Sequence, residues 1–349
     1  MKYKDFLKRL YPLLLILIVF IVWKYRESKK EEPQMVEISG TTMGTIGYSV
    51  KYFSESDKNF GVEIDSLLKV WNLSLSTYIP TSEISRFNVG DSCFHFESAY
   101  FLPVLKASQE VFEKSGGAFD PTLGPIVNAW GFGPDKSMVP DSSRVDSLKA
   151  LVGFEKISFD NTKVCKSIPD MQLDFSAIAK GYAVDVVADY LLAKGIDDLL
   201  VEIGGEIVCR GAKPGDASWI TAIEDPTVEV YEREVLAVVA LDNKAVATSG
   251  NYRNYYVRSG RKYAHTIDPS TGYPVFHELL SASVFAEDCM LADAYATAFM
   301  VLGLDKAKEI LKQDEALDAY LIYAGDDGEI ETFVTGGIAG HIKKYNDED

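Results

Sequence analysis

The sequence lacks the signatures of several large enzyme classes. None of the motifs G-x-G-x-x-G, G-x-x-x-x-G-K-[ST], H-E-x-x-H or G-x-S-x-G occurs in its 349 residues. Their absence argues against a Rossmann dehydrogenase, a P-loop nucleotidase, a zincin protease and an α/β-hydrolase. Cysteine is also scarce, because the four thiols, Cys93, Cys165, Cys209 and Cys289, include no C-x-x-C pair. This spacing argues against a zinc site or a dense disulfide framework, and we expect single buried thiols.

Positive charge is scarce as well. The chain has 35 Lys and Arg residues against 52 Asp and Glu residues, a net charge of −17, and eight of the 35 fall within the first 30 residues. The remainder is therefore more acidic than the whole, and it would repel the backbone of a nucleic acid, so we expect no nucleic-acid partner. A phosphate-bearing ligand must be held locally, by backbone N–H groups, a bound cation or a few placed side chains.

The N-terminus has the pattern of a targeting segment. Basic residues precede and follow a 14-residue apolar run from Leu10 to Trp23. Such a run is short for a membrane-spanning helix and long enough for the core of a signal peptide. Since no A-x-A-like cleavage site follows, we expect residues 1–23 to be an uncleaved membrane anchor. The basic residues at the start favour a body on the exported side, with a cleaved signal as the alternative.

Beyond a charged linker at 24–35, we expect one catalytic domain over 36–349. Hydrophobic periodicity predicts helices at about 57–75, 99–115, 176–194, 289–302 and 305–313, and a short helix before a strand pair within 141–172. It predicts strands within 36–53, 199–209, 218–224, 235–241, 245–248, 252–257, 261–267, 280–286 and 318–335. Because helices and strands do not alternate regularly, we expect an α+β fold with large mixed or antiparallel sheets and packed helices.

Three segments in the first half carry residue types that suit a nucleotide ligand. The turn GTTMGT around Met43 presents backbone N–H and hydroxyl donors to a flat ring or a phosphate, or is a plain β-turn. Tyr78 lies in a loop, where its ring either stacks on a ligand or packs on the core. Asp120 in GAFDPTLGP either accepts a hydrogen bond from a ribose or ring N–H, or caps local backbone.

A fourth segment, LDFSAIAKGYAVD, enters a helix. Asp174 and Ser176 precede this helix, whose first N–H groups are unpaired and suit a phosphate. Lys180 follows about one turn into the helix, where it can face the same ligand. The alternative is simple N-capping by Ser176, with Lys180 in solvent.

Two further segments suit proton transfer and cation binding. His265 precedes a DPSTG turn, where an imidazole either serves as a general base near neutral pH or packs against the turn. Asp293 and Thr297 are four residues apart on one predicted helix, so their oxygens project from one face. A carboxylate and a hydroxyl suit Mg²⁺, although such a pair can also simply bond to each other.

These six segments, together and in this order, resemble the ApbE family of FAD:protein FMN transferases. The most specific stretches are GGAFDPTLGPIVNAWGFG, LDFSAIAKGYAVD, HTIDPSTGYP and ADAYATA. The resemblance implies the family's α+β fold and an enzyme that binds FAD and Mg²⁺. It implies transfer of FMN through a phosphoester bond to a Thr or Ser hydroxyl of a target protein, with release of AMP. The implied targets are exported subunits of the Na⁺-translocating NADH:quinone reductase or of Rnf-type complexes.

The resemblance also implies a role for individual residues. His265 would be the base that takes the proton from the acceptor hydroxyl, and Mg²⁺ would be held by Asp293, Thr297 and the backbone carbonyl of Ala177. The FAD site would be lined by Met43, Tyr78, Ala118, Phe119, Asp120, Asp174, Lys180 and Ile267. Two alternatives stay open: a metal-dependent FAD pyrophosphatase that uses water as the acceptor, and a non-catalytic FAD-binding protein. The second has no use for a base or a hydrolytic metal.

Overall fold

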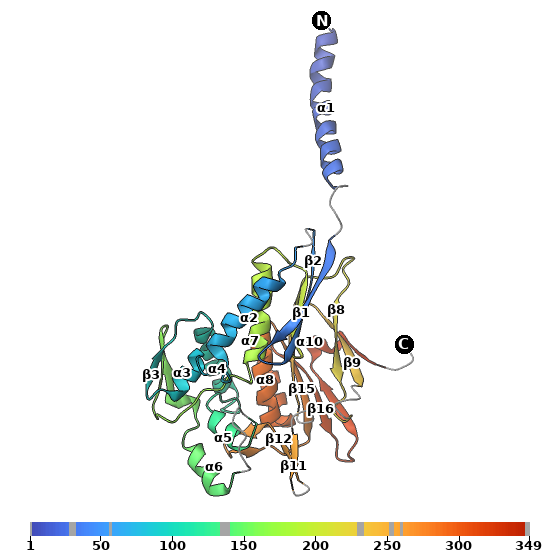
Figure 1. Cartoon of the computed structure of the whole chain (residues 1–349). Helices are drawn as coiled ribbons and strands as arrows, with labels where there is room; N and C mark the ends of the chain where they lie inside the picture. Colours follow the sequence, from blue (N-terminus) through green and yellow to red (C-terminus); the bar gives the residue numbers. More distant parts are fainter. Residues whose placement is uncertain are drawn as a thin grey trace.

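The body of the chain is built on one eight-stranded sheet (Figure 1). The computed structural model describes residues 2–27, 33–55, 58–132, 140–228, 234–250, 255–258 and 261–345. In sheet order, the strands are β1 (Gln34–Thr42), β2 (Ile46–Ser54), β6 (Leu199–Ile203), β7 (Glu206–Arg210), β10 (Ala245–Gly250), β15 (Leu279–Ala286), β16 (Asp318–Ala324) and β17 (Ile330–Val334). Each neighbouring pair in this order is antiparallel. The predicted α+β class with a large antiparallel sheet is therefore confirmed.

Helices cover one face of this sheet. The two central ones, α7 and α8, lie against each other, with α7 on β6 and β7 and α8 on β10 and β15. The helices are α1 (Lys2–Glu27), α2 (Gly61–Leu75), α3 (Glu83–Val89), α4 (Phe101–Lys114), α5 (Gly124–Ala129), α6 (Ser142–Lys149), α7 (Ala179–Leu192), α8 (Cys289–Leu302), α9 (Leu304–Gln313), α10 (Gly336–Ala339) and the short 3-10 turn Phe154–Lys156. Large buried side chains such as Trp71, Tyr295 and Phe299 fill this side of the core. Burial of this apolar face holds α7 and α8 in fixed positions.

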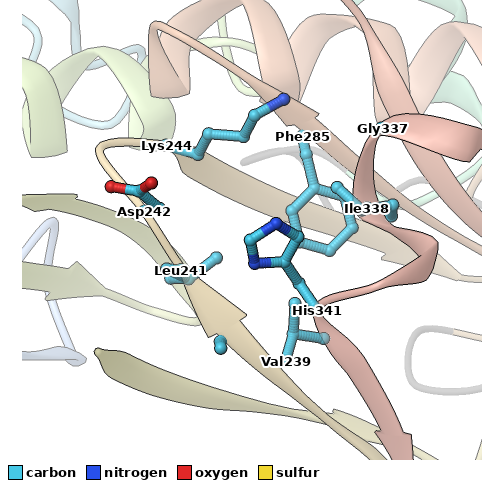
Figure 2. A pocket seen from close by; sticks show the side chains of 9 residues that line it. Val239, Leu241, Asp242, Lys244, Phe285, Gly337, Ile338 and His341 are labelled. Carbon is cyan, nitrogen blue, oxygen red and sulfur yellow. The ribbon is translucent and has the colours of Figure 1, made fainter. Parts of the chain in front are cut away.

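The opposite face of the sheet has its own layer. A three-stranded sheet of β8 (Trp219–Glu224), β9 (Val235–Leu241) and β18 (Ile342–Lys344) packs there. Trp219, Phe285 and Ile338 belong to the apolar cluster on this side. Figure 2 shows a pocket between these layers, lined by residues that include Lys244 and His341. None of the predicted site residues lines that pocket.

Three small sheets complete the body. They are β3 (Cys93–His95) with β5 (Lys163–Lys166) and β4 (Ile157–Phe159), β11 (Tyr255–Arg258) with β12 (Arg261–Ala264), and β13 (Ile267–Asp268) with β14 (Tyr273–Pro274). Cys93 and Cys165 lie opposite each other on β3 and β5 and form a disulfide. The prediction of four single thiols was therefore wrong for this pair, since strand pairing brings together cysteines that are 72 residues apart. Cys209 and Cys289 are free and buried, as predicted.

Removing the disulfide is expected to destabilise the fold strongly. A cross-link that closes a 72-residue loop restricts the unfolded chain, which by chain-entropy estimates stabilises the fold by about 4 kcal/mol. We expect the double variant Cys93→Ser/Cys165→Ser to lose most of this free energy of unfolding, as measured by chemical denaturation. Dithiothreitol should destabilise the wild type similarly and leave the double variant unchanged. Equal stability of the two proteins in oxidising buffer would contradict this expectation.

Two predicted boundaries need correction. The segment 199–209 was predicted as one strand, but Gly204 and Gly205 turn it into a hairpin with φ values of +65° and +104°. Most non-glycine residues avoid such angles, so the Gly-Gly pair fixes the turn. The helix predicted from 176 begins at Ala179, after one irregular turn. No helix within the described ranges has the length and apolar character that crossing a membrane requires.

Candidate functional site

The two central helices approach each other closely at Gly181 of α7. A Cβ atom on Gly181 would lie 2.2 Å from the carbonyl oxygen of Cys289 and 2.8 Å from the Cβ of Asp293, so no larger residue fits without movement. The Gly181 N–H donates to the Asp293 carboxylate of α8 at 3.0 Å. In the other direction, Asp185 of α7 accepts from the first two N–H groups of α8, those of Cys289 and Met290, at 2.9 and 2.7 Å. Each helix thus holds the other through a carboxylate, which fixes Asp293.

A cluster of buried charges lies beside this contact. Lys180 of α7 donates to Oε1 of Glu206, the first residue of β7, and the Glu206 side chain is almost fully buried. Asp293 is close enough for its charge to act on both groups. Burial raises the pKa of Glu206 to about 7, against the opposing effect of Lys180. Burial also disfavours the Lys180 ammonium, but the charges of Glu206 and Asp293 outweigh it and raise its pKa.

The turn that carries Met43 adjoins this cluster. Met43 joins β1 to β2 and is half-buried, with a φ of +48°, a left-handed conformation that is uncommon outside glycine and recurs at functional sites. A Cβ on Gly204 would meet the Ile46 side chain at 2.8 Å and Cδ of Lys180 at 3.6 Å. The Gly204 N–H also donates to the carbonyl of Gly47 at 3.1 Å. The structure therefore brings the first and fourth predicted segments together.

The loops of Asp120 and Asp174 are joined to each other. The Asp174 N–H donates to the carbonyl of Pro121 at 2.7 Å. Oδ1 of Asp120 accepts from the N–H and the hydroxyl of Thr122 at 2.8 and 2.6 Å, and Oδ1 of Asp174 accepts from the Ser176 N–H at 2.9 Å. Burial raises the pKa of both carboxyls, that of Asp120 to about 6. Each carboxylate thus supports its own turn, which shapes the backbone in front of α7.

N-capping by Ser176, the alternative considered for this helix, is wrong. Ile178 is the residue at the N-cap of α7, and it makes no side-chain cap. The Ser176 side chain is exposed. The first N–H groups of α7 are nevertheless not unpaired as predicted, because that of Ala179 donates to the Phe175 carbonyl and that of Gly181 to the Asp293 carboxylate.

His265 packs against the end of the stretch GGAFDPTLGPIVNAWGFG. It lies between β12 and β13, is half-buried, and has the ring of Phe132 edge-on at 6.3 Å between centroids. Trp130 Nε1 donates to the Gly272 carbonyl at 2.8 Å, and the Trp130 ring lies 5.7 Å from that of Tyr273. The segments GGAFDPTLGPIVNAWGFG and HTIDPSTGYP are thus one packed unit. Figure 1 shows β12 and α5 at the same end of the body.

The remaining residues that were predicted to contact FAD differ in how far their side chains are exposed to solvent. Tyr78 is 69% exposed in the loop between α2 and α3, so its ring is open to a ligand. Ala118 is buried in the loop that follows α4. Phe119 and Ile267 are each only 2% exposed and pack in apolar clusters. Their side chains are therefore core residues, and a ligand can meet only their backbone.

Comparison with known proteins places this arrangement in a family. The ApbE family matches residues 43–321 of the sequence. The chain belongs to the ApbE family. It is 39% identical over 306 residues to the FAD:protein FMN transferase of Vibrio cholerae, covering 85% of this chain and 90% of that protein. It is 40% identical over 312 residues to that of Haemophilus influenzae, covering 86% and 89%.

Solved structures of ApbE proteins share the fold. The flavin transferase ApbE from Vibrio cholerae aligns with a TM-score of 0.79 at 36% identity, covering 88% of this chain and 99% of that one. The flavinyl transferase ApbE of Pseudomonas stutzeri, in its apo form, aligns with a TM-score of 0.78 at 36% identity, covering 88% and 96%. The resemblance seen in the sequence is thereby confirmed.

The residues that ApbE membership implies for Mg²⁺ fit a hard cation. Asp293 is buried on α8, and Thr297 lies one turn further, with its Oγ1 3.3 Å from Oγ of Ser249. Asp293 accepts from the Gly181 N–H, whereas the hydroxyl of Thr297 has Ser249 as its neighbour. Ala177 precedes Ile178, the N-cap of α7, so its carbonyl lies outside the hydrogen-bond ladder of the helix. Carboxylate, hydroxyl and carbonyl oxygens are the donors that Mg²⁺ prefers.

Sequence reasoning missed three residues that shape the site. Glu206, Asp185 and Ser249 were not singled out, although each contacts a predicted site residue or its helix. For Glu206 a signal exists, because a Gly-Gly pair between two β-type runs marks a hairpin and places the next residue at a strand start. Asp185 and Ser249 carry no comparable local signal, since their partners lie far away in the sequence.

Replacing Gly181 is expected to destabilise the fold and disturb the cation site together. The added methyl group of Gly181→Ala would lie 2.2 Å from the Cys289 carbonyl, so α7 and α8 must separate. We expect a loss of at least about 3 kcal/mol in the free energy of unfolding and weaker Mg²⁺ binding, measured by denaturation and calorimetry. Gly336→Ala is the control, because nothing lies within 4 Å of a Cβ there. Equal stability of the two variants would disprove the close helix contact.

Proposed function

We propose that this ApbE enzyme transfers the FMN half of FAD to the hydroxyl of a Thr or Ser residue in a protein acceptor and releases AMP. The observation that carries the proposal is the group formed by half-buried Lys180 and the buried acids Glu206 and Asp293, where α7 meets α8. It lies beside the turn of Met43 and one helical turn from the loop of Asp174. Those are the segments that the family resemblance assigns to FAD.

Several groups would bind the FAD pyrophosphate. Lys180 places an ammonium in the first turn of α7, where its charge would attract the phosphates. Asp293, Thr297 and the carbonyl of Ala177 would hold Mg²⁺, which on binding supplies positive charge to the phosphates and the leaving group. Tyr78 is open to stack on a ring of the ligand. Local cations thus offset the acidity of the rest of the protein.

His265 would act as the general base. Its imidazole would take the proton of the acceptor hydroxyl as that oxygen attacks the phosphorus on the FMN side of the pyrophosphate. The new P–O bond joins FMN to the acceptor, and the bond that breaks leaves its electron pair on the oxygen of AMP. The packing of His265 against Phe132 restricts where the ring can lie, which keeps the base in a defined place.

A metal-dependent FAD pyrophosphatase is the second candidate function. It would use the same groups, with water in place of the acceptor hydroxyl, and would release free FMN and AMP. A non-catalytic FAD-binding protein fits less well, because the buried cluster of charges would have no role in storage.

We also propose that the catalytic domain acts on the exported, periplasmic side of a bacterial inner membrane. The disulfide Cys93–Cys165 supports this location, because disulfides persist in oxidising compartments. The large apolar side chains of α1 from Leu13 to Trp23 are exposed, and an anchoring role of residues 1–23, like their cleavage or retention, stays a prediction. Acceptors of the exported redox complexes named above would share this compartment.

The function is tested by intact mass spectrometry of an acceptor. The full chain is mixed with FAD, Mg²⁺ and an exported redox subunit that carries the family's Thr acceptor motif. We expect the acceptor to gain the mass of one FMN residue, and to gain nothing when EDTA removes the cation. Free FMN and AMP without a gain of mass would support the pyrophosphatase instead. Intact FAD with no product would contradict both enzymatic readings.

A further inference from the structure

Only one of the two carboxylate oxygens of Glu206 accepts a hydrogen bond from the cluster. Oε1 accepts the hydrogen bond from Lys180, whereas Oε2 is buried and has no hydrogen-bond partner within the described part of the chain. The residue is 2% exposed. A buried carboxylate with an unsatisfied oxygen is costly in a free protein, so this residue points to a state in which the cluster holds a further positive group.

The hairpin geometry directs Glu206 into the site. Glu206 pairs with Ile203 across the Gly-Gly turn of β6 and β7, and directly paired residues share one face of a sheet. Ile203 belongs to the core on the side of α7 and α8. Glu202, one residue before Ile203, lies on the opposite face, because successive side chains alternate. Only Glu206 of these two acids therefore reaches the cluster.

The charges of the cluster determine what it attracts. Lys180 contributes one positive charge, and Glu206 and Asp293 contribute one negative charge each, so the ionised cluster is net negative. Glu206 in effect cancels the charge of Lys180, which would otherwise attract a pyrophosphate. A divalent cation at Asp293 reverses the sign of the cluster.

We propose that Glu206 makes the binding of FAD conditional on the divalent cation, because it neutralises Lys180 until that cation enters. This inference rests on the proposed function and deepens it. Without the cation, the pyrophosphate meets a net negative cluster and binds weakly. With the cation, Lys180 and the metal together attract the phosphates, so the enzyme is loaded with FAD only when it also holds the metal that the reaction requires. Glu206 is thus a positioning residue that acts through Lys180.

The test compares cation and FAD binding in the full-length protein and its Glu206→Gln variant. Mn²⁺ alone is titrated and followed by electron paramagnetic resonance, and FAD binding is followed by flavin fluorescence in EDTA and in Mg²⁺. We expect Glu206→Gln to bind Mn²⁺ at least tenfold more weakly and to bind FAD in EDTA at least tenfold more tightly. A merely structural role would instead weaken both together, and that result would overturn the proposal.

Two further variants sharpen the test. Glu202→Gln removes the same charge from the opposite face of the hairpin and should change neither affinity. The double variant Lys180→Gln/Glu206→Gln restores the net charge of the wild-type cluster, so FAD binding should again depend on the cation, at lower affinity. Equal cation dependence of FAD binding in Glu206→Gln and the wild type, or a double variant that has lost it, would overturn the proposal. A wild type that binds no FAD even with Mg²⁺ would instead overturn the proposed function.

Discussion

His265→Ala should abolish flavin transfer while FAD binding is retained. Loss of a general base typically lowers a rate about 10²- to 10⁴-fold, and the alanine leaves the pyrophosphate-binding groups around Lys180 untouched. His265 lies between β12 and β13 at the turn that packs on Trp130, so a change confined to its ring should not unfold this unit. The rate is measured as FMN gained by the acceptor per unit time, and FAD affinity by flavin fluorescence.

A matched substitution distinguishes the loss of the general base from the loss of a histidine elsewhere in the protein. His95 is exposed on β3, so His95→Ala should transfer flavin at the wild-type rate. If His265→Ala loses FAD binding to the same extent as transfer, the residue is a ligand contact or a structural group instead of the base. Full transfer by His265→Ala would remove the residue from the mechanism.

Asp293→Asn should lower the cation-dependent rate about 100-fold, which corresponds to about 3 kcal/mol of transition-state stabilisation. The amide keeps the size of the carboxylate, and its oxygen can still accept from the Gly181 N–H. It removes the negative charge that would hold the cation beside Thr297. The reaction should also need a much higher Mg²⁺ concentration, measured as the half-saturating concentration for transfer.

The stability of the same variant gives an independent check. Burial raises the pKa of Asp293, so the ionised carboxylate is unfavourable in the cation-free fold. Asp293→Asn should therefore be at least as stable as the wild type in EDTA, and it should gain less stability from added Mg²⁺. Glu309→Gln on the exposed face of α9 is the control for loss of one acid. Wild-type Mg²⁺ dependence in Asp293→Asn would exclude Asp293 as a ligand.

The sequence was most informative where a local pattern determines the structure. The helix predicted at 289–302 is observed as α8, over the same residues. Asp293 and Thr297 project from it as their four-residue spacing requires. The turn at Met43 was likewise predicted from its glycines and is observed between β1 and β2. Local periodicity and turn chemistry were enough for these elements.

Contacts between distant segments were not predictable in the same way. The pairing of Cys93 with Cys165 depends on the register of β3 and β5, which no local pattern encodes. The cluster of Lys180, Glu206 and Asp293 combines a helix start, a hairpin and a second helix. Glu206 was missed because its hairpin was predicted as a single strand. In the middle of such a strand, an acidic residue carries no signal of a functional role.

A crystal structure of the protein with FAD and Mn²⁺, recorded at the manganese absorption edge, would test the site most directly. We predict one anomalous peak within bonding distance of Asp293, Thr297 and the carbonyl of Ala177. The FAD pyrophosphate should lie between that peak and Lys180, with His265 facing the phosphorus on the FMN side. A manganese peak elsewhere, or FAD bound away from the α7–α8 contact, would contradict the assignment of this site.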